Sequence, residues 1–231
     1  MLRSLINRLL ARAGLRVSRI NDNGWSIHNV RKPGLEPATI FDIGVHSGTP
    51  ELYAAFPETY YVLVDPLKEN ERHLKKILTQ YRGEYLLEAA GATMGAATIY
   101  VEPSLVGRSS LLERTRFTTT GSDLEERSIP VTTLDEIVAK RGLSGPFGIK
   151  IDTEGFELEV IRGAQRTLRD SQFVIAEVSV SKRFESGYVF ADMISEMAKH
   201  GFHLCDVLTV PRSHRTREAM FLDVMFRPAT S

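Results

Sequence analysis

Cysteine is almost missing from the sequence, because Cys205 is the only one in 231 residues. A single cysteine excludes an internal disulfide and a metal site built from several cysteines, and it fits a reducing compartment such as the cytoplasm. The chain also has no excess of charge of either sign, since Lys+Arg and Asp+Glu number 29 each. Nucleic-acid-binding domains are usually basic, so we expect no nucleic-acid partner.

The N-terminus contains no long uninterrupted apolar run. Leucine and isoleucine recur there at helical spacing, but Arg3, Arg8 and Arg12 stand between them. This pattern is typical of neither a signal peptide nor a transmembrane span. We predict an amphipathic helix within residues 1–24 that packs on the domain or on a partner subunit of a homo-oligomer. Peripheral contact with a membrane surface is the alternative role for this helix.

Residues 25–231 alternate between short apolar runs and amphipathic stretches. The runs "ATIFDIG", "YYVLVD", "FGIKID" and "QFVIAEVSV" are typical of buried strands, and helical patterns such as "KENERHLKKILTQY" stand between them. "ATIYVE" predicts a further strand, at an edge or antiparallel. This alternation predicts a single α/β domain with a largely parallel sheet covered by helices on both faces.

Acidic residues follow four of the predicted strands. Asp42, Asp65, Asp152 and Glu177 each end an apolar run. Ligands of open α/β sheets bind at the carboxyl ends of the strands, so these acids should meet at one edge. One such acid alone would be interpreted as a helix cap or a solvated carboxylate, but four at one edge indicate a site.

The loop between Asp42 and Gly48 has neither of the two common phosphate-binding signatures. G-x-G-x-x-G and G-K-[ST] are both missing, which disfavours an NAD-dependent oxidoreductase. Gly44 and Gly48 would let the backbone approach a small ligand closely. Asp42 suits a cationic amino-acid group, and Asp65 lies where an acid can accept both hydroxyls of a ribose. An amino acid and a ribose without phosphate describe S-adenosylmethionine.

Several stretches resemble, in order, the FkbM family of S-adenosylmethionine-dependent methyltransferases. They are "FDIGVHSGT", "VLVDP", "AAG", "IPVTTLDEI", "IKIDTEGFELEVIRGAQRTL" and "VIAEVSV", which together span residues 40–180. The resemblance implies the class I, Rossmann-like methyltransferase fold, with seven strands of which the last is antiparallel. It also implies methyl transfer to a hydroxyl oxygen of a sugar, a glycan or a related natural product.

The resemblance further implies a set of cofactor-binding residues. Asp42, Gly44 and Gly48 would line the methionine end. Asp65 would hold the ribose, although the family more often has the longer glutamate there. Ala90 and Gly91 would border the adenine. His46 and Pro66 lie in the same two loops and complete the set, with simple packing as the alternative role for His46.

Three carboxylates are candidates for the chemistry. Asp152 and Glu154 follow the strand "FGIKID", and Glu177 ends the next strand. We predict that Asp152 acts as a general base or positions the acceptor. The alternative is that the three acids hold Mg²⁺, which would lower the pKa of the acceptor hydroxyl. A buried lysine at Lys150 would need one of these acids as its partner.

Residues 102–127 interrupt the alternation with a long polar stretch, and loops of that length tend to be functional. We predict that Arg108, Ser109 and Ser110 hydrogen-bond a hydroxyl-bearing small molecule or glycan. A surface loop or a dimer contact is the alternative role for this stretch.

A non-catalytic cofactor-binding or interaction module is the alternative function of the whole chain, and it would not need the three carboxylates together.

Overall fold

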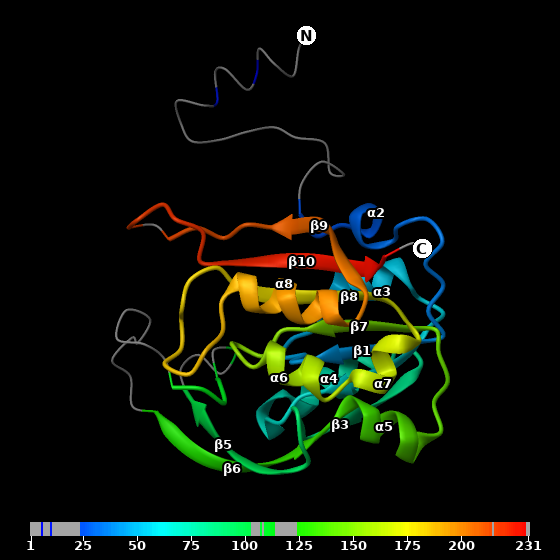
Figure 1. Cartoon of the computed structure of the whole chain (residues 1–231). Helices are drawn as coiled ribbons and strands as arrows, with labels where there is room; N and C mark the ends of the chain where they lie inside the picture. The colour runs from blue at the N-terminus through cyan, green and yellow to red at the C-terminus, as the bar shows by residue number, and fades with distance from the viewer. Residues whose placement is uncertain are drawn as a thin grey trace.

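The computed structural model describes residues 6, 10, 24–102, 107, 109–113, 124–213 and 215–229. Most of the predicted N-terminal helix lies outside this part of the chain, as do Arg108 and many of residues 102–127. The described part forms two sheets (Figure 1). One has seven strands and lies between two layers of helices, and the other is separate and has three strands. No helix in it is long and apolar enough to span a membrane.

The main sheet has the strand order β3-β2-β1-β7-β8-β10-β9. The first five strands in this order pair in parallel, whereas β10 is antiparallel to both of its neighbours. The predicted antiparallel last strand is therefore confirmed. The strand bounds are Thr39–Ile43 for β1, Tyr60–Val64 for β2, Gly83–Leu86 for β3, Phe147–Ile151 for β7, Ser171–Ser179 for β8, Phe202–Thr209 for β9 and Phe221–Pro228 for β10.

Helices cover both faces of this sheet, as predicted. Because successive side chains of a strand point to opposite faces, β1 sends Ile40 into one core cluster and Phe41 into the other. The Ile40 cluster contains residues of α2 (Ile27–Val30), α3 (Pro50–Ala55) and α4 (Glu71–Ile77), the last preceded by the 3₁₀ helix η3 (Lys68–Asn70). The Phe41 cluster contains residues of α5 (Leu134–Arg141), α6 (Glu157–Arg162), α7 (Gln165–Arg169) and α8 (Phe190–Lys199).

Local sequence sets the two ends of α5. Thr133 precedes the helix in an extended conformation, and its side-chain oxygen accepts the backbone N–H of Glu136 at 3.1 Å. This bond satisfies one of the donors that a helix leaves free at its N-terminus. Gly142 ends the helix with a φ of 60°, a left-handed conformation that glycine adopts without a steric penalty.

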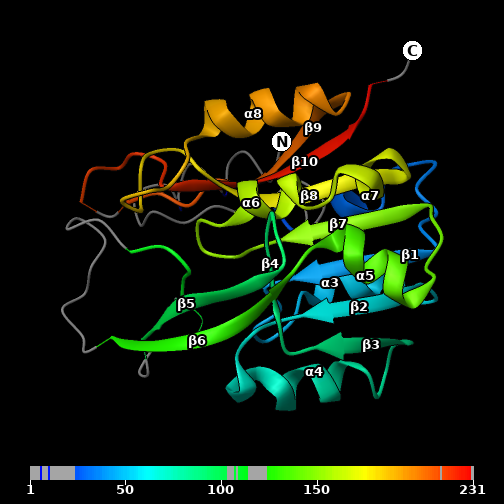
Figure 2. The same cartoon turned by 60° about the horizontal axis from the view of Figure 1, so that its bottom comes forward.

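A second sheet has the order β4-β6-β5, from Ala89–Ala90, Glu125–Thr132 and Gly95–Val101. β5 contains the predicted strand "ATIYVE" except Glu102, and it is antiparallel and at an edge, as predicted, but it pairs with β6 and not with the main sheet. Ile99, Val101 and Ile129 pack on Leu67 in a small cluster of their own. Figure 2 shows β5 and β6 extending past the carboxyl ends of the parallel strands, so this sheet borders the edge where the site is expected.

Candidate cofactor and active site

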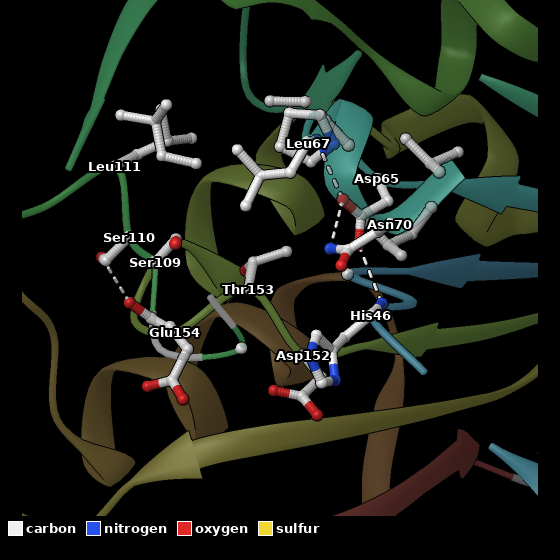
Figure 3. Close-up of a pocket in the computed structure, with 18 of the residues that line it drawn as sticks. His46, Asp65, Leu67, Asn70, Ser109, Ser110, Leu111, Asp152, Thr153 and Glu154 are labelled. Carbon is white, nitrogen blue, oxygen red and sulfur yellow. Dashed lines mark hydrogen bonds between the residues drawn. The ribbon is translucent and has the colours of Figure 1, made fainter. Parts of the chain in front are cut away.

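A cavity of about 190 Å³ lies at the carboxyl ends of β1, β2 and β7 (Figure 3). Its lining brings together most of the predicted site residues from segments far apart in the sequence. They are Gly44, His46, Asp65, Pro66 and Ala90 of the cofactor set, Asp152, Glu154 and Glu177 of the catalytic set, and Ser109 and Ser110 of the acceptor set. Asp42, Gly48 and Gly91, also predicted to bind the cofactor, lie outside this lining.

The loops after β1 and β7 touch at Gly44. A β-carbon on Gly44 would lie 1.7 Å from the carbonyl oxygen of Asp152, and the residue has a left-handed φ of 74°. Only glycine meets both requirements without displacing the backbone. The N–H of Gly44 donates to the carbonyl of Val64 at 2.8 Å, and the N–H of Asp152 donates to that of Ile43 at 3.0 Å. The first loop is therefore fixed by its two neighbouring strands.

Asp65 directly follows β2 and is a firmly held hydrogen-bond acceptor, with only 3% of its surface exposed. One carboxylate oxygen accepts the N–H of Leu67 at 2.9 Å, and the other accepts the N–H of His46 at 2.8 Å. The side-chain amide of Asn70 lies 3.0 Å from both oxygens. Figure 3 shows Asp65, Asn70 and His46 grouped on one side of the cavity. Asn70 was not predicted as a site residue, because nothing in its local sequence sets it apart.

His46 takes part through its backbone. Its φ is 46°, a conformation uncommon for residues other than glycine, and this turns its N–H onto Asp65. The imidazole is exposed and lies near Gly107, whose β-carbon, if present, would approach the ring to 3.1 Å. The structure thus gives His46 a part in shaping the loop, as well as a place in the cavity lining.

Asp42 is completely buried beneath the first loop. Its carboxylate accepts hydrogen bonds from the hydroxyls of Tyr53 at 2.5 Å and Thr49 at 3.4 Å. Burial, and then the charge of Asp42, raise the pKa of Tyr53, so the phenol stays a donor. The other carboxylate oxygen lies 3.3 Å from the ammonium of Lys150, as an ion pair without hydrogen-bond alignment. The predicted contact of Asp42 with the cofactor stays a prediction, and in the geometry observed its partners are protein groups.

Lys150 is the buried lysine that the sequence predicted would need an acid. Its ammonium lies between Asp42 and Asp152, whose carboxylate is 3.6 Å away, and it donates to the carbonyl of Gly44 at 3.3 Å. Burial on its own lowers the pKa of Lys150, but the two carboxylates outweigh it and the pKa is raised. Lys150 is thus a permanent positive charge beside Asp152.

Arg183, which the sequence did not indicate, lies between two of the predicted catalytic acids. It donates to Glu177 at 2.8 Å and to Glu154 at 2.6 Å, and its guanidinium stacks 4.8 Å from the ring centre of Phe221. Burial, and then the charge of Asp152, raise the pKa of Glu177, while Arg183 opposes that shift.

This arrangement does not fit the alternative of a Mg²⁺ site. The guanidinium of Arg183 occupies the position between Glu154 and Glu177 that a cation would take, and the ammonium of Lys150 lies next to Asp152. The described part of the chain also contains no group of three or more His, Cys, Asp or Glu side chains arranged to hold a metal ion. The two basic side chains thus take the positions beside these carboxylates that a metal ion would need.

The loop after β7 is held from two sides. Glu157 accepts the N–H groups of Thr153 at 2.9 Å and Gly155 at 3.0 Å, and its second oxygen accepts the hydroxyl of Tyr188 at 2.8 Å. From the other side, the hydroxyl of Ser110 donates to the carbonyl of Glu154 at 2.6 Å.

These contacts hold Glu154 at a left-handed φ of 52°, and such strained residues cluster at functional sites. Asp152 remains the accessible acid of this loop, with 39% of its side chain exposed. Ser110, predicted to bind the acceptor, uses its single hydroxyl proton to hold the loop. Ser109 lines the cavity beside it.

The chain matches one family model and is similar to several solved structures. A family model described as "Methyltransferase FkbM domain" matches residues 42–204. Methyltransferase FkbM from Methylobacillus flagellatus KT is similar over 82% of this chain and 43% of its own, at 16% identity and a TM-score of 0.51. Fibrillarin from Aeropyrum pernix is similar over 96% of this chain and 74% of its own, at 15% identity and a TM-score of 0.42.

The chain therefore spans less than half the length of the Methylobacillus protein. Comparison with curated proteins found no match. The strand order and the antiparallel β10 are those of the class I S-adenosylmethionine-dependent methyltransferases. Since the family model covers well over half of its residues, the chain belongs to the FkbM methyltransferase family.

Proposed function

We propose that the protein transfers a methyl group from S-adenosylmethionine to a hydroxyl oxygen of a sugar, a glycan or a related natural product. The observation that carries this proposal is the placement of Asp65 and Asp152 on one cavity. The first is a buried acceptor at the end of β2, and the second is an accessible carboxylate at the end of β7.

The cavity offers suitable partners for each part of the cofactor. Asp65 can accept the ribose hydroxyls, in competition with the amide of Asn70. Leu67, Ile99 and Leu111 form an apolar wall that suits the adenine. The hydroxyl of Thr153 is buried in the lining and has no hydrogen-bond partner among the described residues. Buried polar groups are normally satisfied, so we propose that a bound ligand supplies the partner of this hydroxyl.

S-adenosylmethionine, when bound, supplies a methyl group that is already activated for displacement. The protein then has to align the acceptor oxygen with that methyl group and remove the hydroxyl proton. Asp152 suits the second task because its carboxylate is accessible and lies beside the fixed charge of Lys150. Glu154 and Glu177 suit it less, because Arg183 holds both. We therefore assign them to shaping the pocket.

The test is transfer of a labelled methyl group from S-adenosylmethionine to a panel of sugars and glycans, with products identified by mass spectrometry. We expect methyl ethers, and we expect Asp152→Asn to lower the rate by about 10²-fold or more, the usual scale for acid–base catalysis. Asp192→Asn is a matched control, since Asp192 lies in the first turn of α8, outside the cavity lining. Methylation on nitrogen or carbon would contradict the proposal.

A further inference from the structure

A second cleft, of about 310 Å³, lies beside the cofactor cavity. Two residues, Asp152 and Glu177, line both hollows. The rest of the second lining comes from the start of α3, from β7 and β10, and from the segment before α2. These residues are Trp25, Gly48, Thr49, Pro50, Glu51, Lys150 and Asp223. The proposed base is therefore also accessible from the second cleft, whose lining contains Gly48 but no other residue of the predicted cofactor set.

The floor of this cleft follows from the alternation of side chains along the strands. Ile175 and Met225 belong to the core cluster of α2 and α3, so Glu177 and Asp223, each two residues away, project to the same face. Glu177 and Asp223 are also direct partners in the pairing of β8 with β10. The cleft is thus the continuation of the α2 and α3 face beyond its apolar core.

Trp25 forms one wall and is held in place from several directions. Its indole N–H donates to Asp223 at 2.9 Å, and Asp223 also accepts the hydroxyl of Thr209 at 2.5 Å. The amide of Asn29 donates to the carbonyl of Gly24 at 2.8 Å, which ties down the chain just before the tryptophan. Trp25 is half-buried, so part of its ring remains exposed. A rigid aromatic ring with a fixed polar end is a common element of binding surfaces.

Protein groups already contact the carboxylates of the floor. Lys150 lies between Asp42 and Asp152, Arg183 binds Glu177, and Asp223 accepts two neutral donors. Lys150 and Arg183 lie beside Asp152 and Glu177, in the positions that a cationic ligand would need. The carboxylate oxygens keep free lone pairs, which suit the hydroxyl groups of a neutral ligand.

We propose that this second cleft binds the acceptor as a single neutral, polyhydroxylated ring that packs on Trp25 and presents one hydroxyl to Asp152. The cleft has a volume of about 310 Å³, which is enough for one such ring. This inference rests on the proposed function, and it places the acceptor in a cleft that Ser109 and Ser110, which line the cofactor cavity, do not line.

The chain offers its own reporter, because Trp25 is its only tryptophan. The full-length protein is first saturated with S-adenosylhomocysteine and then titrated with the methyl glycosides of glucose, galactose, mannose and rhamnose. We expect at least one of them to change the tryptophan fluorescence saturably. Isothermal titration should show that Trp25→Ala weakens its binding by about tenfold, as loss of a ring contact does, and that Trp25→Phe weakens it less.

Tyr85→Ala is the matched control, because Tyr85 is also half-buried but lies on β3, at the other end of the sheet. Its glycoside affinity should equal that of the wild type. Unchanged binding of S-adenosylhomocysteine by Trp25→Ala would show that the variant is folded. If S-adenosylhomocysteine binds but no glycoside affects Trp25, the acceptor cleft is refuted while the proposed function stands. If S-adenosylhomocysteine does not bind the wild type, the proposed function fails, and this inference fails with it.

Discussion

Replacing Arg183 by methionine would remove the shared partner of two acids. The arginine is only 7% exposed, and the Glu177 side chain that it binds is only 10% exposed. Removing one member of a buried ion pair costs about 3–5 kcal/mol, because it leaves a buried charge without compensation. In a domain of this size 1 kcal/mol corresponds to about 2–4 °C in Tm. We therefore expect the variant to melt about 6–20 °C below the wild type.

The loss should also grow with pH. Burial raises the folded-state pKa of Glu177 above its unfolded value, and Arg183 counteracts part of that rise. In that case the native state binds the proton more tightly than the unfolded state. The free energy of unfolding then falls as pH rises from the unfolded pKa through the folded pKa. Without Arg183 the folded-state pKa of Glu177 should rise further. The difference in Tm between the Arg183→Met variant and the wild type should therefore widen between pH 5 and pH 8.

Thermal melts at pH 5 and pH 8, followed by circular dichroism, measure both effects. Adding Glu177→Gln to the Arg183→Met variant should recover part of the lost stability at pH 8, because it removes the uncompensated charge. Glu177→Gln alone is the control and should cost less, since Arg183 keeps its bond to Glu154. A Tm loss that is the same at both pH values, or one that Glu177→Gln does not reduce, would refute the reasoning.

Three further changes test other parts of the site. Gly44→Ala should lower the free energy of unfolding by more than 1 kcal/mol in denaturant titrations, because its β-carbon would meet the backbone of Asp152 at a left-handed φ; unchanged stability would contradict this. Tyr53→Phe should cost about 1–3 kcal/mol in the same assay, since Asp42 loses a buried donor; unchanged stability would show that Thr49 and Lys150 suffice as partners of Asp42. Methyl transfer should survive exhaustive EDTA treatment, because Lys150 and Arg183 already supply the positive charge; loss of activity that Mg²⁺ restores would return the metal to the mechanism.

Rules that act locally along the chain made much of the fold predictable. The apolar runs and the helical patterns between them fix the order of strands and helices, and parallel strands place Asp65, Asp152 and Glu177 at one edge. The same rules could not predict that β5 and β6 form a separate sheet, because their pairing crosses the long segment between Val101 and Glu125.

The site residues that the sequence did not predict depend on contacts between residues far apart in the chain. Trp25 and Asp223 are 198 positions apart in the chain, so no local pattern connects them. Arg183 follows β8 in a segment without regular structure, and only tertiary packing shows that it binds both Glu154 and Glu177. The alternative of a Mg²⁺ site rested on the carboxylates alone, and the sequence did not reveal the arginine that lies between Glu154 and Glu177 and argues against it.

The most direct test of cofactor use is the Tm of the protein with S-adenosylhomocysteine, compared with NAD, for the wild type and for Asp65→Asn. Ligand at 100 times its Kd stabilises the native state by about 2.7 kcal/mol, which corresponds to about 5–11 °C here. Glu58→Gln, a change at an exposed acid between α3 and β2, is the matched control and should keep the full shift. We expect S-adenosylhomocysteine to raise the Tm of the wild type, Asp65→Asn to lose most of that shift, and NAD to have no effect. Stabilisation by NAD, with no response to S-adenosylhomocysteine, would contradict the assignment of this cavity to S-adenosylmethionine.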